Sequence, residues 1–310
     1  MKKILFVLVC LSVTAVSCKK ETEIGGPVTI ITDYDLPQQG ASKEANDRIV
    51  DIYNKYGSYI LYDYEDKDVK WVQASGGSTS TLVITMGDPQ YADKMLDLIG
   101  DAWLQFFPDE FLKKGGLPYR VFLADEISWD RGWTIANYAY TIFGKGITLS
   151  GMNEGLSSMS AATKMQIKNE WIKGVWDYYV ANGLLTVPYD FYSESDYTVT
   201  PSNPNTPENK EALRKLGFLP GTVTADATGA NLFNLEAEWF NGYNWSSARS
   251  LDLAAFVIRM LQATDEQMEQ YLNNPAYDKI QKKWGILVNH YKDNYGIDVR
   301  KIANTVWTAP

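Results

Sequence analysis

The sequence predicts an α+β fold, with a small mixed sheet in the first half of the domain and long helices in the second. Short runs of β-branched and aromatic residues recur up to about residue 150, and 119–124 (YRVFLA) is the clearest of them. From Ser160 onwards, apolar residues recur at helical spacing over segments as long as 160–182. Strands that come first and helices that come later favour α+β.

The N-terminus has the pattern of a secretory targeting segment. Two lysines precede the apolar run 4–13, which is too short to span a bilayer. The sequence Ala-Val-Ser-Cys at 15–18 is typical of a bacterial lipobox, in which the cysteine is acylated after cleavage on its N-side. We therefore predict a lipoprotein signal peptide at 1–17 and a lipid anchor on Cys18. The alternative is an ordinary signal peptide, with this cysteine as a bystander.

The charged and then Gly/Pro-rich segment 18–42 is predicted to be the lipidated cysteine and a flexible tether. Residues 43–310 are predicted to form one domain, with an α/β part to about 182 and a helical part after it. No later stretch approaches 18 apolar residues, so we expect no transmembrane helix. After Cys18 the chain has no further cysteine, so the domain does not rely on disulfides.

The formal net charge is −9, and it becomes −11 once the signal peptide with its two lysines is removed. An acidic balance argues against nucleic acid as a partner and against electrostatic docking on anionic lipid. The chain has 10 Trp and 20 Tyr, and surface aromatics of this kind can stack on sugar rings.

In the first part of the domain, Ser42 is a plausible N-cap for the first helix. The expected elements are a helix at 43–57, strands at 59–64, 69–73 and 81–85, a helix at 88–107, and strands at 119–124, 134–143 and 146–149.

In the second part, Gly183 is the natural end of the long helix 160–182. The expected elements after it are a polar surface loop at 193–207, a helix at 207–216, an irregular stretch at 220–245, helices at 247–261, 265–272 and 274–295, and a last helix capped by Asp298.

One face of the long helix is charged. Glu170, Lys173 and Asp177 are spaced i,i+3 and i,i+4, with Asn169 at the edge of their arc, and the opposite arc is apolar apart from Lys168. The simplest interpretation is a solvated charged face. Residues 169–173 read Asn-Glu-Trp-Ile-Lys, which keeps the glutamate of the zinc-binding pattern His-Glu-x-x-His and replaces both histidines.

The order of several segments resembles a family of bacterial zinc metallohydrolase lipoproteins encoded beside TonB-linked glycan importers. The resemblance runs from about Arg48 to Ile302 and implies a zincin-like metallopeptidase fold. The segments that carry it are 51–56 leading to Tyr64, 107–112 with Leu117-Pro118 and the strand to Leu123, the helix at 160–182, the helix at 250–256, 279–291, and Tyr295-Gly-Ile-Asp298.

Transferred residue by residue, the resemblance places the first zinc histidine at Asn169, the general base at Glu170 and the second histidine at Lys173. The family's later Glu-Asp-x-Ala-Glu pattern becomes Leu251-Asp252-Leu253-Ala254-Ala255, so both glutamates are absent. These departures imply a degenerate site with no bound metal, no cofactor and no catalytic residue. We expect Lys173 to pair with Glu170 and Asp177 and to fill the former metal site electrostatically.

Other constellations carry weaker signals. His290 is the only histidine, so any Ser/His/Asp triad would have to use it. The acidic pairs 125/126, 194/196 and 236/238 could form a glycosidase dyad, and the acidic run 63–68 could hold a hard cation. The best candidates for ligand contact are aromatic side chains in two loop segments, Trp129, Trp133, Trp239 and Tyr243.

The sequence therefore predicts a non-catalytic outer-membrane lipoprotein, displayed at the cell surface or on the periplasmic face. Its expected role, implied by the resemblance, is an accessory to TonB-linked glycan or nutrient uptake that binds a glycan, a peptide or the importer. The alternatives are an active hydrolase, either a metallopeptidase with atypical ligands or a carboxylate glycosidase, and a structural partner of an outer-membrane complex.

Overall fold

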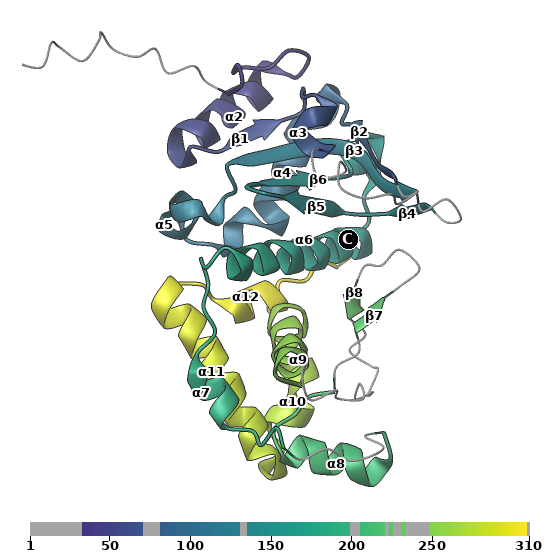
Figure 1. Ribbon diagram of the computed structural model, residues 1–310. Helices are drawn as coiled ribbons and strands as arrows, with labels where there is room; N and C mark the ends of the chain where they lie inside the picture. The colour runs from purple at the N-terminus through teal and green to yellow at the C-terminus, as the bar shows by residue number, and fades with distance from the viewer. Residues whose placement is uncertain are drawn as a thin grey trace, which may run out of the picture. The chain divides into compact units, whose positions relative to one another are not determined.

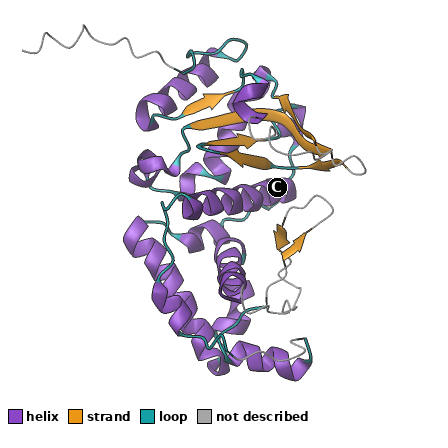
Figure 2. Ribbon diagram, viewed as in Figure 1, coloured by secondary structure: helices purple, strands orange, loops and turns teal. Residues whose placement is uncertain are grey.

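The structure is a computed structural model that describes residues 33–70, 81–130, 135–198, 205–220, 223–225, 231–233 and 248–308. The chain divides after Asp35, and every element below belongs to the part that begins at Leu36. This part is a mixed α/β arrangement with a small mixed sheet and many helices (Figure 2). All strands of the main sheet lie before residue 150, so strands and helices segregate along the chain as the sequence predicts.

The six-stranded sheet is built around one long central strand. Along the first half of this strand both neighbours are parallel, and along its second half both are antiparallel. A further antiparallel strand forms the edge of the sheet. The strands are β3 (Arg120–Asp130) at the centre, β1 (Tyr59–Leu61) and β6 (Gly146–Leu149) beside its first half, β2 (Thr81–Met86) and β4 (Ile135–Asn137) beside its second half, and β5 (Tyr140–Phe143) at the edge next to β6.

The predicted N-cap of the first helix, Ser42, is confirmed. In α2 (Lys43–Tyr56) the Ser42 hydroxyl accepts a hydrogen bond from the backbone N–H of Ala45 at 3.0 Å. The folded part also begins before the predicted boundary at 43. Gln38 is buried, and its amide accepts from the N–H of Tyr62 and donates to the carbonyl of Asp63, both at 3.0 Å. Residues from Gln38 on are therefore fastened to the end of β1.

Three predictions in the first part are wrong in detail. The strand expected at 134–143 is divided into β4 and β5, which pair with different partners, β3 and β6. Residues 69 and 70 belong to a helix, α3 (Asp66–Lys70), rather than a strand, and 71–73 lie outside the described residues. The Asp68 carboxylate accepts the backbone N–H of Glu65 at 2.9 Å, and this local bond outweighs the β-propensity of Val69.

The predicted helix 88–107 is broken. Its regular part is α4 (Ala92–Ala102), which is flanked by the 3₁₀ turns η2 (Pro89–Tyr91) and η3 (Leu104–Phe106). The break falls at Trp103, whose ring is buried and donates from Nε1 to the Tyr179 hydroxyl at 3.0 Å. Packing of this ring therefore decides where the helix ends.

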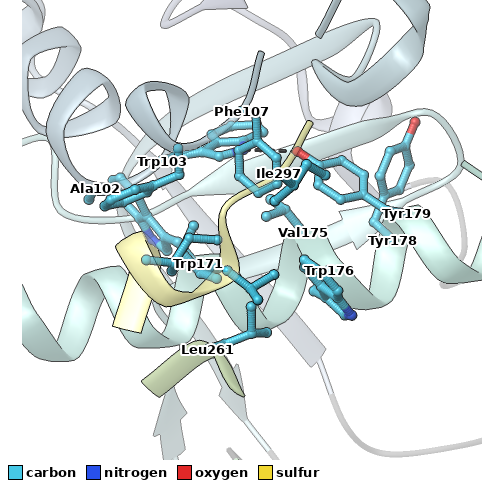
Figure 3. Close-up of a cluster of buried hydrophobic side chains, with 14 of the residues drawn as sticks. Ala102, Trp103, Phe107, Trp171, Val175, Trp176, Tyr178, Tyr179, Leu261 and Ile297 are labelled. Carbon is cyan, nitrogen blue, oxygen red and sulfur yellow. Dashed lines mark hydrogen bonds between the residues drawn. The ribbon is translucent and has the colours of Figure 1, made fainter. Parts of the chain in front are cut away.

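The long predicted helix is confirmed as α6 (Ala161–Ala181), with Ser160 as its N-cap and Gly183 at φ +70 just after it. Its apolar arc packs into the main core (Figure 3). In Figure 3, the side chains of Trp171, Val175 and Trp176 lie among residues at the end of α4, from α9 (Ala248–Gln262) and from the segment before α12 (Val299–Asn304). In Figure 1, α6 lies beside the edge strand β5.

Beyond α6 the chain is mostly helical, as expected, and Asp298 caps the last helix. One part of the irregular stretch 220–245 proves to be a two-stranded antiparallel sheet. The remaining elements are α5 (Asp109–Phe111), η4 (Leu112–Gly116), η5 (Glu154–Ser158), α7 (Tyr189–Ser193), α8 (Pro207–Lys215), β7 (Val223–Ala225), β8 (Asn231–Phe233), α9 (Ala248–Gln262), α10 (Asp265–Leu272), η6 (Pro275–Tyr277), α11 (Asp278–Tyr295) and α12 (Val299–Asn304). Within the described ranges, none of the helices is both long and apolar enough to traverse a bilayer.

Candidate functional site

The polar face of α6 carries the positions that the sequence singles out. Lys173 forms an ion pair with Asp177 one turn later, and their side chains are 21% and 58% exposed. The Glu170 carboxylate accepts a hydrogen bond from the Gln166 amide at 2.8 Å. The predicted pairing of Lys173 with Asp177 is therefore present, and Glu170 is tied to the preceding turn of the same helix.

Asn169, at the edge of this face, is turned towards α9. Its backbone carbonyl accepts a hydrogen bond from the Gln262 amide at 3.2 Å. Its side-chain oxygen is buried and has no hydrogen-bond partner among the described residues. This oxygen is inaccessible to solvent, so it is poorly placed to coordinate an ion that solvent could deliver.

Tyr140, from the edge strand β5, covers the same stretch of α6. A Cβ atom added to Gly174 would lie 2.3 Å from Cε2 of the Tyr140 ring, so the ring lies directly on the helix backbone. Burial raises the pKa of the Tyr140 hydroxyl to about 12, and the charges of Asp177 and Glu170 add to the effect. Sequence reasoning missed this residue, although a glycine in the middle of a long helix was an available signal.

A second contact fixes the start of β5 on α6. The Trp171 ring donates from Nε1 to the carbonyl of Ala139 at 3.0 Å. With Tyr140 over Gly174, this contact holds the strand against the helix along one side of the charged face, next to Glu170.

The groups on this face do not fit a zinc ion. Zinc in proteins takes His, Cys or carboxylate ligands, whereas the face offers a buried amide oxygen, a carboxylate bonded to Gln166, a second carboxylate paired with Lys173, and the Lys173 ammonium itself. An ammonium has no lone pair to donate, and its charge repels a divalent cation. In the described ranges, no group of three His, Cys, Asp or Glu side chains is placed to hold a metal.

The other three positions of the predicted degenerate site, Leu251, Asp252 and Ala255, lie in the first turns of α9. Asp252 is fully buried, and its carboxylate accepts from Lys283 Nζ at 2.6 Å and from the Tyr197 hydroxyl at 2.5 Å. Gln262, the contact of α9 with Asn169, lies about 15 Å further along the helix at 1.5 Å per residue. The hydrogen bonds of Asp252 therefore join it to α11 and not to the face of α6.

Of the predicted ligand-contact aromatics, only Trp129 lies within the described residues; Trp133, Trp239 and Tyr243 lie outside them, as does Cys18. Trp129 is half-buried on β3, in register with Leu82 and Ala136, which are buried. Cross-strand neighbours share a face of the sheet, so part of the Trp129 ring serves the core.

The hydrogen bonds of His290 give it a structural role. Its Nε2 lies 3.0 Å from the carbonyl of Thr186, and its Nδ1 lies 3.1 Å from the side-chain nitrogen of Asn294. This arrangement assigns the ring proton to Nε2, which donates to the carbonyl, while Nδ1 accepts. The histidine therefore fastens the segment after α6 to α11, and its Nε2 has no lone pair with which to activate the nearby Thr186 hydroxyl.

Lys168, the polar exception on the apolar arc of α6, caps another helix. Its buried ammonium donates to the carbonyls of Ile302 and Thr305, both at 2.8 Å, at the C-terminal end of α12. A cation is favourable there because the last carbonyls of a helix lack partners. Burial lowers the pKa of Lys168 to about 8.

No family model matches the chain, and no curated protein matches it. Among solved structures it is similar to the crystal structure of a candidate zinc-binding metallo-peptidase from Bacteroides caccae. The two chains are 15% identical, the similarity covers 87% of this chain and 92% of that chain, and the TM-score is 0.47.

Proposed function

We propose that this chain is a non-catalytic, zincin-like relative of zinc metallopeptidases that acts by binding a ligand. The observation that carries the proposal is the charged face of α6, where Lys173 and Asp177 form an ion pair beside Glu170. Hydrolysis by a zincin needs a metal to lower the pKa of a bound water and to polarise the scissile carbonyl. A glutamate beside an ammonium neither lowers the pKa of a bound water in this way nor polarises the carbonyl.

The repulsion between the Lys173 ammonium and a divalent metal ion would be large. Two unit charges about 4 Å apart interact by about 4 kcal/mol at an effective dielectric constant of 20, and a divalent ion doubles this value. A metal bound beside Glu170 would therefore require Lys173 to leave Asp177 or to lose its proton. The residues that replace the histidines thus disfavour a metal, in addition to failing to bind one.

The ligand class that we propose is a glycan or a peptide. The acidic net charge of −9 disfavours polyanions, and aromatic side chains such as Trp129 suit sugar faces. We further propose that the chain is lipidated at Cys18, lies at the outer membrane and serves a TonB-linked importer. These three features come from the lipobox pattern and from the family resemblance.

The binding proposal is tested with the mature chain from residue 19, expressed without the lipidated cysteine. A panel of oligosaccharides and peptides is titrated by calorimetry, and each ligand is recovered afterwards and weighed by mass spectrometry. We expect at least one ligand to bind and to be recovered intact. Cleavage of the bound ligand would support the hydrolase alternative instead.

The aromatic contacts are tested in the same titration. Trp133→Ala and Trp239→Ala should weaken glycan binding if the rings stack on the ligand, by about 1–3 kcal/mol if a sugar face stacks as strongly as a nucleic-acid base does on an aromatic side chain. Trp307→Ala is a matched control, because that ring already lies against the Lys164 ammonium at 4.6 Å. Unchanged affinity in both loop variants would contradict the predicted contacts.

A further inference from the structure

A lysine ammonium is buried at the junction of four segments in the helical part. The Lys283 side chain is fully buried, and its Nζ donates to the Asp252 carboxylate at 2.6 Å, to the Gly217 carbonyl at 2.8 Å and to the Ser195 hydroxyl at 3.0 Å. An ammonium has three N–H donors, so all of them are used.

Aromatic rings complete the surroundings of this ammonium. The centroids of Phe191, Phe256 and Phe218 lie 4.5, 4.6 and 5.2 Å from Nζ. Ring faces at this distance attract a cation, and more strongly in the absence of water. The Tyr197 hydroxyl adds a second hydrogen bond to the Asp252 carboxylate. Lys283 thus occupies a cage of one carboxylate, two further oxygen acceptors and three rings.

We propose that Lys283 is a latch that holds the residues around Ser195 and Gly217 onto α9 and α11. Its acceptors come from separate stretches of sequence: Ser195 follows α7, Gly217 follows α8, and Asp252 lies in α9. One cation on α11 therefore fixes two points of the chain, and the first of them lies in the stretch that was predicted to be a surface loop at 193–207.

The backbone at Gly217 is shaped for this contact. Gly217 has φ +91, and a Cβ atom there would lie 2.9 Å from both Lys279 Cβ and Ser195 Oγ. Only glycine tolerates this conformation without strain, so the carbonyl of residue 217 can approach Nζ. Phe218, the next residue, places its ring against the same ammonium.

The energetics of buried ion pairs explain why such an arrangement acts as a latch. Replacing both partners by apolar residues is often neutral, whereas removing one leaves an uncompensated buried charge. Without Lys283, the Asp252 carboxylate would remain buried beside three phenyl rings. The segment 194–218 can lower the cost of this buried charge by moving away and admitting water to the carboxylate. The sheet shares none of these contacts, so we expect it to stay unchanged.

The latch is tested by hydrogen exchange with mass spectrometry on the mature chain, comparing Lys283→Ala with Lys282→Ala. Lys282 is the neighbouring lysine. Its pair with Asp278 is exposed and its pair with the half-buried Glu194 is long, at 4.0 Å, so its loss should change little. In Lys283→Ala we expect peptides covering 194–218 to exchange at least about 100-fold faster, while peptides from β3 and β6 keep their rates. Equal exchange in the two variants would overturn the proposal.

Chemical rescue separates the charge from the volume of the side chain. The atoms that Lys283→Ala removes are those of n-propylammonium, and n-propanol is the neutral molecule of the same size. Added n-propylammonium should restore slow exchange in 194–218, and n-propanol should not. Rescue by both molecules, or by neither, would contradict an ammonium-specific cage.

A milder variant covers the case in which Lys283→Ala does not fold. Ser195→Ala deletes one acceptor of three, together with the hydrogen bond that the Ser195 hydroxyl donates to the Leu216 carbonyl at 3.1 Å, and leaves the ion pair in place. We expect exchange within 194–218 to increase by about 10- to 100-fold, which corresponds to about 1.4–2.8 kcal/mol for the two lost hydrogen bonds. An unchanged rate there would overturn the proposal. None of these outcomes depends on whether α6 binds a metal or a ligand.

Discussion

Two lysine–aspartate pairs in this protein differ only in their surroundings. Lys173 and Asp177 lie one turn apart on the polar face of α6, with side chains 21% and 58% exposed, whereas Lys283 and Asp252 join two helices and are both 0% exposed. Bulk water screens the first pair and does not reach the second. Either residue of the exposed pair can therefore be replaced at little cost. Replacing one residue of the buried pair leaves its partner as an uncompensated buried charge.

The largest effect is expected at the buried pair. Lys283→Met should lower the free energy of unfolding by about 3–5 kcal/mol, because it leaves the Asp252 carboxylate buried without its cation. Urea denaturation of the mature chain measures this value. The double variant Lys283→Met/Asp252→Leu should recover much of the loss. A double variant as unstable as the single one would show that the penalty is not electrostatic.

Lys168 is a third lysine to compare with these two. It is buried, it pairs with no carboxylate among the described residues, and burial lowers its pKa to about 8. Below pH 8 both folded and unfolded chains hold this proton, so the cost of the buried charge is fully present. Between pH 8 and the ordinary lysine value of 10.5, the unfolded chain binds more protons, so the stability contributed by Lys168 rises with pH, by up to about 3 kcal/mol.

The measurement is the difference in unfolding free energy between the native chain and Lys168→Met, followed from pH 7 to pH 10.5. The raised pKa values of several tyrosines act in both proteins, so they cancel in the difference. We expect the native chain to gain stability relative to the variant as the pH rises. A flat difference would contradict a lowered pKa at Lys168.

The contact between β5 and α6 can be broken at Gly174. Gly174→Ala places a methyl group against the Tyr140 ring and should destabilise the protein by about 1–3 kcal/mol, although alanine favours helix. Gly100→Ala on α4 is the matched control, since nothing lies within 4 Å of its Cβ position. Combining Gly174→Ala with Tyr140→Ala should remove part of the penalty, and strict additivity would show that the two residues do not touch.

The smallest effect is expected at the exposed pair. Lys173→Ala should cost about 0.3–0.5 kcal/mol from the lost i,i+4 ion pair, and added salt should reduce this difference. A double-mutant cycle with Asp177→Ala isolates the interaction. A coupling energy above about 2 kcal/mol would show that the pair is far less screened than its exposure indicates.

The sequence predicted the features that depend on local patterns. Ser42 and Asp298 cap the helices that they were expected to cap, and the pair of Lys173 with Asp177 follows from helical spacing alone. The order of strands before helices also gave the mixed α/β class.

The features that the sequence did not predict depend on contacts between distant segments. Nothing near Asp252 in sequence indicates that Lys283 neutralises it, and the reason for Lys168 on an apolar arc lies at residues 302 and 305. Trp103 ends α4 because its ring reaches Tyr179. The lipid anchor at Cys18 and the contacts of Trp133, Trp239 and Tyr243 remain predictions.

Zinc content decides whether α6 binds a metal, and we infer that it does not. The mature chain is loaded with zinc, desalted and analysed by native mass spectrometry beside the variant Asn169→His/Lys173→His, which places a histidine on each side of Glu170. We expect about zero zinc per native chain and measurable binding in the variant. One tightly held zinc per native chain, lost in Glu170→Ala, would contradict the claim and make an active metallopeptidase the leading hypothesis.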